Sequence, residues 1–190
     1  MKTFWIVVIV VVALAATVFA AVFLRDPTPP SIQSTSGGAS GAAGENIFGR
    51  ISGFEFKDYS GNIVSLAEFE GKPLVVNSWA VWCPFCRQEL PDFARLQQEL
   101  GDEIVVIAID RQEPLARAKE YTDGLGISSD MHFWLDDADV FYRTIGGFSM
   151  PETLFINVAG EIVVHKRGPM DLEEMKEHAG KILSAGVSVL

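Results

Sequence analysis

The amino-acid sequence predicts an α/β domain with a mixed β-sheet, preceded by an apolar N-terminal segment and a linker. Two observations lead to this fold class. Short apolar strands alternate with amphipathic helical stretches beyond residue 46, and two closely spaced strands near the C-terminus precede a last helix. Hydrophobic residues make up 48% of the 190 residues, so the chain can bury a sizeable core.

The first half of the domain is expected to contain a hairpin, a buried strand and a long helix. Apolar and polar residues alternate over Phe54–Phe56 and Ile63–Leu66, on either side of a Ser-Gly-Asn turn, which is typical of a hairpin. The apolar run within Pro73–Ser78 predicts a buried strand. A helix is expected over Pro84–Leu100, where apolar residues recur every three or four positions. These residues are Cys86, Leu90, Phe93, Leu96 and Leu100.

The second half continues the alternation of strands and helices. Strands are expected at Ile104–Ile109, Phe133–Leu135, Thr153–Ile156 and Ile162–Val164. Helices are expected over Pro114–Leu125, over Asp137–Ile145 and from Asp171 onward. Asp171 and Glu174 have the spacing of a capping box, which marks the start of the last helix.

Residues 1–25 predict a membrane anchor. Phe4–Leu24 contains no charged residue and is about as long as the ~20 residues that a helix needs to cross a bilayer. Lys2 precedes it, which predicts a single-pass protein of the cytoplasmic membrane with its N-terminus inside and its domain outside. A cleaved signal peptide is the alternative, because Val18-Phe19-Ala20 resembles a cleavage site. The length of the apolar run and Arg25 after it favour an uncleaved anchor.

Residues 26–46 predict a flexible linker. They are rich in Pro, Gly, Ser and Ala and contain one large apolar residue, Ile32, so they cannot form a core. A flexible coil of this length spans roughly 25 Å on average. The folded domain is therefore expected to occupy residues 47–190.

Charge and cysteine content exclude several classes of protein. The formal net charge of −10 argues against a nucleic-acid partner, because phosphate binding needs a positive surface. The two cysteines lie three residues apart, which leaves a redox pair, half of a zinc site or two structural cysteines as alternatives. A zinc site would need further ligands at short spacing, whereas His132, His165 and His178 are scattered.

The segment Cys83-Pro84-Phe85-Cys86 is the strongest candidate for chemistry. Cys83 stands at the N-terminus of a predicted helix, where free backbone N–H groups and the helix dipole favour a thiolate. Pro84 suits the first helical turn because an N–H there has no intrahelical partner. Cys86 lies one turn further, on the buried stripe. Cys83 is therefore expected to attack a substrate disulfide as an exposed thiolate, and Cys86 to resolve the mixed disulfide.

Two segments resemble the TlpA/ResA-like branch of the thioredoxin superfamily, and the resemblance covers roughly residues 47–190. Residues 79–91 (WAVWCPFCRQELP) are similar to the family's active-site segment, and residues 147–156 (GFSMPETLFI) to its cis-proline loop and following strand. The resemblance implies a thioredoxin-like fold with an N-terminal hairpin. It also implies a membrane-anchored reductase of periplasmic or cell-surface disulfides.

The resemblance further implies an acidic residue that serves Cys86. Asn77 stands where thioredoxin has a buried Asp, and an Asn cannot take a proton from a thiol. Glu89 is the implied substitute, since a Glu three residues after the second cysteine is an active-site residue in ResA-like proteins. As a carboxylate it would disfavour a second negative charge on the cysteines. The alternative is a solvated surface Glu.

Four more residues are expected to frame the site. A cis bond between Met150 and Pro151 would expose the Met150 backbone beside Cys83, where a substrate strand could pair with it. Trp82 and Trp79 flank the cysteine turn and are expected to frame it, with a place in the core as the alternative.

The sequence thus predicts an extracytoplasmic disulfide reductase whose redox group is the Cys83–Cys86 disulfide, with no other cofactor and no metal. The resemblance implies protein disulfide substrates, apocytochrome c among them, and a membrane electron donor of the CcdA/DsbD type. The Pro-Phe dipeptide between the cysteines differs from the Glu-Pro of ResA, so a disulfide-forming oxidant remains an alternative. A thiol-based metal or haem chaperone is another, with His132 or His165 as a further ligand. A peroxidase is disfavoured, because Ala80 stands where those enzymes need Thr.

Overall fold

The computed structural model of the protein describes residue 47 and residues 53–185, so the anchor and linker expected from the sequence lie outside the described residues. Within the described ranges, no helix has the length and apolar character needed to span a membrane. The elements, in chain order, are β1 (Phe56–Asp58), β2 (Ile63–Val64), η1 (Leu66–Phe69), β3 (Leu74–Trp79), α3 (Pro84–Leu100), η2 (Gly101–Glu103), β4 (Val105–Arg111), α4 (Leu115–Leu125), β5 (His132–Asp136), α5 (Val140–Thr144), β6 (Glu152–Ile156), β7 (Ile162–Arg167) and α6 (Leu172–Ser184).

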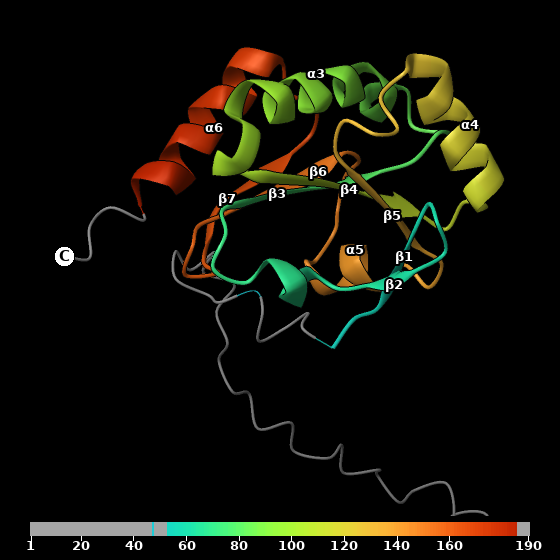
Figure 1. Cartoon of the computed structure of the whole chain (residues 1–190), viewed down its shortest axis with the longest axis horizontal. Coiled ribbons are helices and arrows are strands. Elements are labelled where there is room, and N and C mark those ends of the chain that lie inside the picture. The colour runs from blue at the N-terminus through green and yellow to red at the C-terminus, as the bar shows by residue number, and fades with distance from the viewer. Residues whose placement is uncertain (1–46, 48–52, 186–190) are drawn as a thin grey trace, which may run out of the picture. The chain divides into compact units, whose positions relative to one another are not determined.

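The described strands form one mixed sheet in the order β2-β1-β5-β4-β3-β6-β7. Strands β3, β4 and β5 are parallel, whereas the β1–β2, β1–β5, β3–β6 and β6–β7 pairs are antiparallel. Figure 1 shows α3, α4 and α6 on one face of this sheet and α5 on the opposite face. The predicted α/β class with a mixed sheet flanked by helices is confirmed.

Each face of the sheet has its own core, because successive residues of a strand point to opposite faces. In β3, Val75 packs in the cluster that contains Phe93 of α3. Its neighbour Val76 packs in the cluster that contains Phe141 of α5. The same alternation turns Asn77 toward α3. The sheet therefore presents a buried polar side chain to the helix that carries the cysteines.

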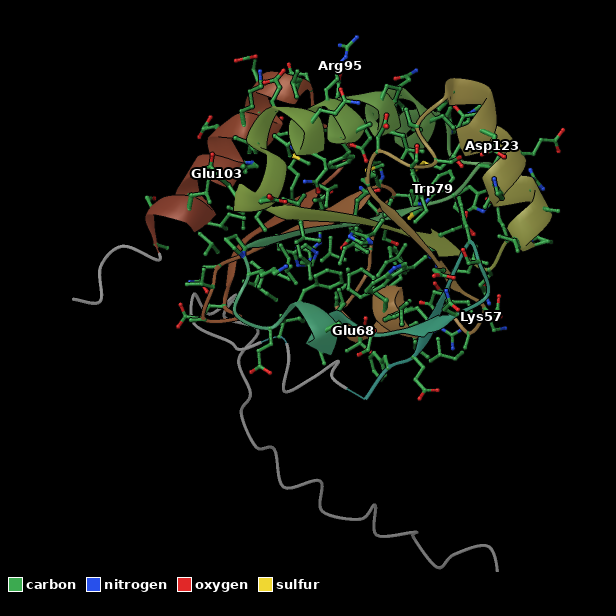
Figure 2. All side chains as sticks on the ribbon, viewed as in Figure 1. Lys57, Glu68, Trp79, Arg95, Glu103 and Asp123 are labelled. Atoms are coloured by element: carbon green, nitrogen blue, oxygen red, sulfur yellow. A yellow bond between two sulfur atoms is a disulfide. The ribbon has the colours of Figure 1, made fainter. Side chains whose placement is uncertain are left out.

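Helix α3 has the bounds that the sequence predicts, Pro84 and Leu100. It continues through Pro91, which has no N–H to donate to the preceding turn, so the helix lacks one backbone hydrogen bond there. Figure 2 shows that α3 has an inner and an outer side. Trp79 lies between the sheet and the helices, whereas Arg95 points outward from α3, away from the sheet. Packing of the apolar stripe thus positions the helix and its N-terminal turn.

The predicted strand Ile63–Leu66 is wrong beyond Val64, because Ser65 caps a short 3-10 helix instead. The Ser65 hydroxyl accepts the N–H of Ala67 at 3.3 Å, and the Ser65 N–H donates to the Glu68 carboxylate at 2.7 Å. This reciprocal pair satisfies the free N–H groups at the start of η1. A capping box therefore replaces the last two residues of the expected strand.

The start of α5 differs from the sequence prediction, whereas α6 begins directly after its cap Asp171, as expected. The helix expected from Asp137 begins at Val140, because the Asp136 carboxylate accepts the first two N–H groups of α5. In α6, Asp171 accepts the N–H of Glu174 at 2.9 Å, as a cap should. The Glu174 carboxylate contacts a lysine of β7 at 2.6 Å. The structure therefore contains the Asp171 half of the expected capping box.

Candidate active site

Cys83 and Cys86 form a disulfide at the junction of β3 and α3, with their Cα atoms 5.3 Å apart. Cys83 is the N-cap residue of α3, which confirms its predicted position at the helix N-terminus. Its Sγ accepts the N–H of Cys86 at 3.2 Å. Hydrogen bonds to a charged acceptor are stronger than those to a neutral one, so this donor favours a thiolate on Cys83 when the disulfide opens.

The disulfide is buried in the oxidised protein. Cys83 is 3% exposed and Cys86 is fully buried, so the prediction of an exposed Cys83 is wrong for this state. The physical reason is packing, since both cysteines belong to the hydrophobic core cluster on the α3 side of the sheet. By contrast, Trp82 is 55% exposed and Phe85 is 52% exposed. The solvent-facing surface at the cysteine segment therefore includes these two aromatic side chains.

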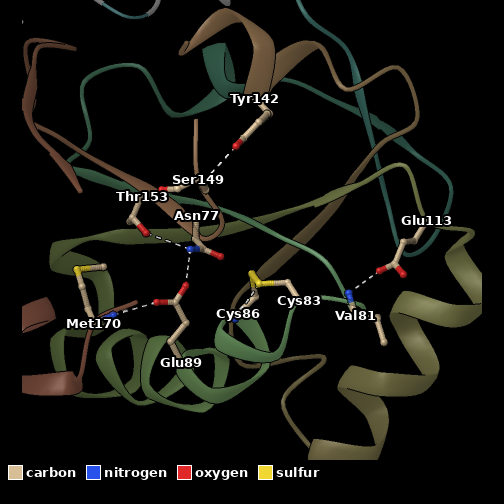
Figure 3. The surroundings of a disulfide bond; sticks show 10 residues. All are labelled: Asn77, Val81, Cys83, Cys86, Glu89, Glu113, Tyr142, Ser149, Thr153 and Met170. Carbon is tan, nitrogen blue, oxygen red and sulfur yellow. Dashed lines mark hydrogen bonds between the residues drawn. A yellow bond between two sulfur atoms is a disulfide. The ribbon is translucent and has the colours of Figure 1, made fainter. Parts of the chain in front are cut away.

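Glu89 is a buried carboxyl group and not a solvated surface residue, which excludes the alternative left open by the sequence. Its Oε1 accepts a hydrogen bond from Asn77 Nδ2 at 2.9 Å, and its Oε2 accepts the N–H of Met170 at 3.2 Å. Asn77 Nδ2 also donates to Thr153 Oγ1 at 3.0 Å. Figure 3 shows Glu89 between Asn77 and Met170, next to the disulfide. Residues of β3, α3, β6 and the segment before α6 thus meet around Glu89 and Asn77.

Burial raises the pKa of Glu89 to about 8, although the hydrogen bonds from Met170 and Asn77 and the charge of Lys166 act in the opposite direction. In the oxidised protein this pKa favours the neutral acid at neutral pH. Glu89 follows Cys86 by three residues on α3, so the two side chains lie on the same face of the helix. Both side chains are buried, so Glu89 and Cys86 share the inner face of α3.

Asn77 has a second polar atom near the cysteines. Its Oδ1 is buried and has no hydrogen-bond partner among the described residues. Figure 3 shows this oxygen turned toward the disulfide. An unpaired buried acceptor is costly. A Cys86 thiol, formed when the disulfide is reduced, could donate its S–H there.

The peptide bond between Met150 and Pro151 is cis. The preceding loop is fixed by side chains that the sequence analysis did not identify. Glu152 Oε1 accepts the N–H groups of Phe148 at 2.5 Å and Ser149 at 2.8 Å, and the Tyr142 hydroxyl donates to the Ser149 carbonyl at 3.1 Å. Phe148 is 86% exposed at the tip of this loop. The only sequence signal for Glu152 was its place directly after the proline.

Two further acids escaped the sequence analysis. Glu113 Oε2 accepts the N–H of Val81, two residues before Cys83, and the Glu113 N–H donates to Asp110 Oδ1 at 3.1 Å. Figure 3 shows Glu113 reaching Val81 on the side of the disulfide away from Glu89. The signal was positional, because Asp110 lies near the end of the buried parallel strand β4 and Glu113 follows that strand. The carboxyl ends of such strands commonly form sites.

Other residues singled out from the sequence have packing or ion-pair contacts of their own. Trp79 is fully buried in the core cluster that contains both cysteines, in contact with the rings of Tyr121 and Phe133. His132 packs against Phe69, and His165 Nε2 lies 2.7 Å from a Glu152 carboxylate oxygen. No three His, Cys, Asp or Glu side chains converge into a metal-binding group within the part of the chain that the structure describes.

Comparison with known proteins identifies relatives of this fold and site. The Redoxin family matches residues 49–183, well over half of the chain. The thiol-disulfide oxidoreductase ResA of Halalkalibacterium halodurans is 30% identical over 125 residues, which cover 65% of this chain and 70% of that protein. The thioredoxin-like protein YneN of Bacillus subtilis is 30% identical over 129 residues, covering 65% and 73%.

Solved structures agree with this assignment. The exposed lipoprotein thioredoxin Etrx1 of Streptococcus pneumoniae superimposes with a TM-score of 0.60 at 26% identity, covering 67% of this chain and 98% of that one. These matches establish a thioredoxin-like fold and agree with the resemblance that the two sequence motifs carry. The chain therefore belongs to the Redoxin family and, within it, to the ResA-like thiol–disulfide oxidoreductases.

Proposed function

We propose that this oxidoreductase works as a disulfide reductase outside the cytoplasm, held at the cytoplasmic membrane by Phe4–Leu24. Its substrates are protein disulfides, apocytochrome c among them, and its electron donor is a membrane protein of the CcdA/DsbD type. The family membership supports this proposal. The observation that carries the chemistry is the buried Glu89 carboxyl group, which can give a proton to Cys86 and take it back.

Substrate reduction begins at Cys83. Its thiolate attacks one sulfur of the substrate disulfide, whose S–S bond breaks, and the second substrate sulfur leaves as a thiolate. Cys86 then gives its proton to the Glu89 carboxylate and attacks Cys83 Sγ. The mixed disulfide breaks, the second substrate thiolate leaves, and the Cys83–Cys86 disulfide forms. Two electrons have passed from the protein dithiol to the substrate.

During re-reduction the same proton moves in the opposite direction, from Glu89 to Cys86. A thiolate of the electron donor attacks Cys83 Sγ, and Cys86 leaves as a thiolate. The neutral Glu89 carboxyl group, present at neutral pH in the oxidised protein, supplies the proton that Cys86 takes up. The second donor thiol, once deprotonated, attacks the mixed disulfide and releases Cys83 as a thiolate. The donor is thereby oxidised to a disulfide.

The proposed direction of electron flow, from the protein to its substrate, is based on the weak stabilisation of the Cys83 thiolate in the reduced protein. No charged residue lies between the cysteines, and Cys83 has the helix N-terminus and the Cys86 N–H as its stabilising donors among the described contacts. A weakly stabilised thiolate makes the disulfide the favoured form, and hence the dithiol a better reductant.

The reduction potential tests this proposal. The protein is equilibrated with glutathione or dithiothreitol buffers, and the fluorescence of Trp79 and Trp82 reports the redox state. We expect a potential below roughly −200 mV, nearer to thioredoxin than to DsbA at about −120 mV. A value near −120 mV would make the protein an oxidant. The Cys86→Ser variant cannot form the internal disulfide, and it serves as the control for fluorescence changes unrelated to this bond.

A further inference from the structure

A buried acidic pair lies beside the turn that leads into the cysteines. Asp110, near the end of β4, is fully buried, and Glu113 is 6% exposed. The Glu113 N–H donates to Asp110 Oδ1 at 3.1 Å. Asp110 Oδ2 has no hydrogen-bond partner among the described residues. An unpaired oxygen on a fully buried carboxyl group is costly, unless that group holds a proton and donates it to a neighbour.

The pair is connected to Cys83 through the backbone. Glu113 Oε2 accepts the N–H of Val81 at 2.5 Å. Val81 belongs to the turn Ala80–Cys83, which is closed by the Cys83 N–H donating to the Ala80 carbonyl at 3.1 Å. The inner N–H of such a turn has no partner within the turn. Glu113 therefore fixes the peptide group that sets the direction in which the chain reaches Cys83.

Few charges are available to balance two ionised carboxylates at this place. Arg117 Nε lies 3.1 Å from Glu113 Oε1 and supplies one positive charge. Among the residues that the structure describes, Tyr59 also faces Asp110, and burial raises the pKa of Tyr59, so it stays a neutral phenol. Burial and the neighbouring Glu113 raise the pKa of Asp110 to about 8. One proton on the pair therefore leaves one negative charge, which Arg117 balances.

We propose that Asp110 and Glu113 are a proton-sharing positioning pair, which holds the turn that presents Cys83 and couples the Cys83 thiolate to one further proton. With the proton bound, the Asp110 O–H donates to the Glu113 carboxylate, which remains free to accept the Val81 N–H. A thiolate on Cys83 adds a negative charge near the pair, so the shared proton is bound more tightly in the reduced protein. By linkage, the same proton stabilises the thiolate.

This inference concerns the cysteine pair itself and holds for either direction of electron flow. The backbone amide of Val81 reports on it directly, because its hydrogen bond ends on the pair. The measurement uses the full-length protein in detergent micelles with 15N-labelled valine, and Val81→Ile assigns the resonance. The Glu89→Gln background removes the other buried acid that titrates in this pH range.

In this background the Val81 amide resonance should titrate once near pH 8 in the oxidised protein. The midpoint should rise by roughly half to one pH unit on reduction, as expected for a new unit charge nearby. Asp110→Asn keeps a hydrogen-bond donor for Glu113 without a titrating proton, so the transition should disappear while the disulfide still forms. Glu120→Gln, an exposed acid on the same helix as Arg117, is the matched control and should change neither midpoint.

A rate measurement tests the positioning role. Glu113→Ala removes the acceptor of the Val81 N–H and should slow the reaction of Cys83 with a protein disulfide by roughly tenfold. Glu113→Gln keeps an acceptor oxygen and should restore most of this loss. The proposal is overturned if the Val81 resonance does not titrate between pH 6 and 10. It is also overturned if Asp110→Asn leaves the titration unchanged, or if oxidised and reduced proteins share one midpoint.

Discussion

The side-chain amide of Asn77 donates a hydrogen bond to Glu89 Oε1 at 2.9 Å, and both residues are buried. Asn77 lies on β3 and Glu89 on α3, so this bond ties the central sheet to the helix that carries the cysteines. The bond itself lowers the pKa of Glu89, but burial outweighs it and raises that pKa to about 8. Substitution of Glu89 should therefore change both the stability and the redox chemistry in a pH-dependent way.

Glu89→Gln should alter the pH dependence of stability. The pKa of Glu89 is about 8 in the folded protein, against 4.5 for an unperturbed Glu. Between these values the folded state keeps a proton that the unfolded state has lost. The contribution of this proton to stability is thus complete below about pH 4.5 and is lost as the pH rises through about 8. Removing it should make the slope of the unfolding free energy more positive, by up to about 1.4 kcal/mol per pH unit.

Denaturant unfolding of the oxidised protein at pH 5, 6 and 7 measures this slope. The variant and the wild type are compared at each pH, so that other titrating groups, such as His132, cancel. Glu120→Gln removes an exposed acid and should leave the slope as it is in the wild type. Parallel slopes for Glu89→Gln and the wild type would mean that Glu89 is ionised at neutral pH.

The redox potential should depend on pH differently in Glu89→Gln. In the wild type the proton of Glu89 is coupled to the charge of the cysteines, so the plot of potential against pH should bend near pH 8. Gln cannot titrate, and this bend should disappear in the variant while the fold is kept. Equilibration with dithiothreitol buffers between pH 6 and 9, read by tryptophan fluorescence, gives both curves. Two superimposable curves would remove Glu89 from the proton transfer.

The features that could be predicted from the sequence are those that depend on a short stretch of residues. The bounds of α3 could be inferred because Pro84, the apolar stripe and the following glycine mark them within one segment. The start of α5 could not, because the Asp136 side chain reaches over the expected first turn to cap it. Local patterns also located Cys83 and Cys86.

The burial of Glu89 was not predictable in the same way. It depends on Asn77 and Met170, which are 12 and 81 residues away in sequence. The link from Glu113 to Val81 likewise spans 32 residues. Neither contact leaves a pattern within a short window of sequence, so the proton chemistry around the disulfide emerged only from the fold.

The two cysteines should differ in reactivity. Cys83 accepts the Cys86 N–H at the start of α3, and its pKa should lie well below the free value of ~8.5, in the range of about 6 to 8. Cys86 is fully buried and should stay protonated. Alkylation of the reduced protein at neutral pH, read by peptide mass, should label Cys83. Preferential labelling of Cys86 would reverse the two roles.

The domain should lie outside the cytoplasmic membrane. Phe4–Leu24 is long and apolar enough to cross a bilayer, and Lys2 before it favours a cytoplasmic N-terminus. Alkaline phosphatase fused after residue 46 should be active, since that enzyme requires an oxidising compartment. A fusion directly after Lys2 should be inactive. The mature protein should keep Met1 or Lys2 at its N-terminus, whereas a mature N-terminus at Ala21 would show that the segment is cleaved.

Gly147→Ala should impair the loop that precedes the cis-proline. A Cβ atom on residue 147 would lie 2.5 Å from ring atoms of Tyr142. This ring cannot move freely, because its hydroxyl donates to the Ser149 carbonyl and the Arg111 guanidinium lies 3.5 Å from its centroid. Arg111 is itself held by two hydrogen bonds of 2.7 Å to Asp139. The added methyl group should therefore displace the loop, at a cost of about 1–3 kcal/mol in stability.

The effect should depend on the size of the substrate. A protein disulfide needs the Met150 backbone for strand pairing, so its kcat/KM should fall roughly tenfold in Gly147→Ala. A small aromatic disulfide needs only the Cys83 sulfur, and its rate should change less than about twofold. Gly124→Ala, where the new methyl group meets nothing within 4 Å, is the matched control and should affect neither substrate. An equal loss with both substrates would indicate that the variant damages the cysteine site itself, and an unchanged rate with both would show that the loop does not position the substrate.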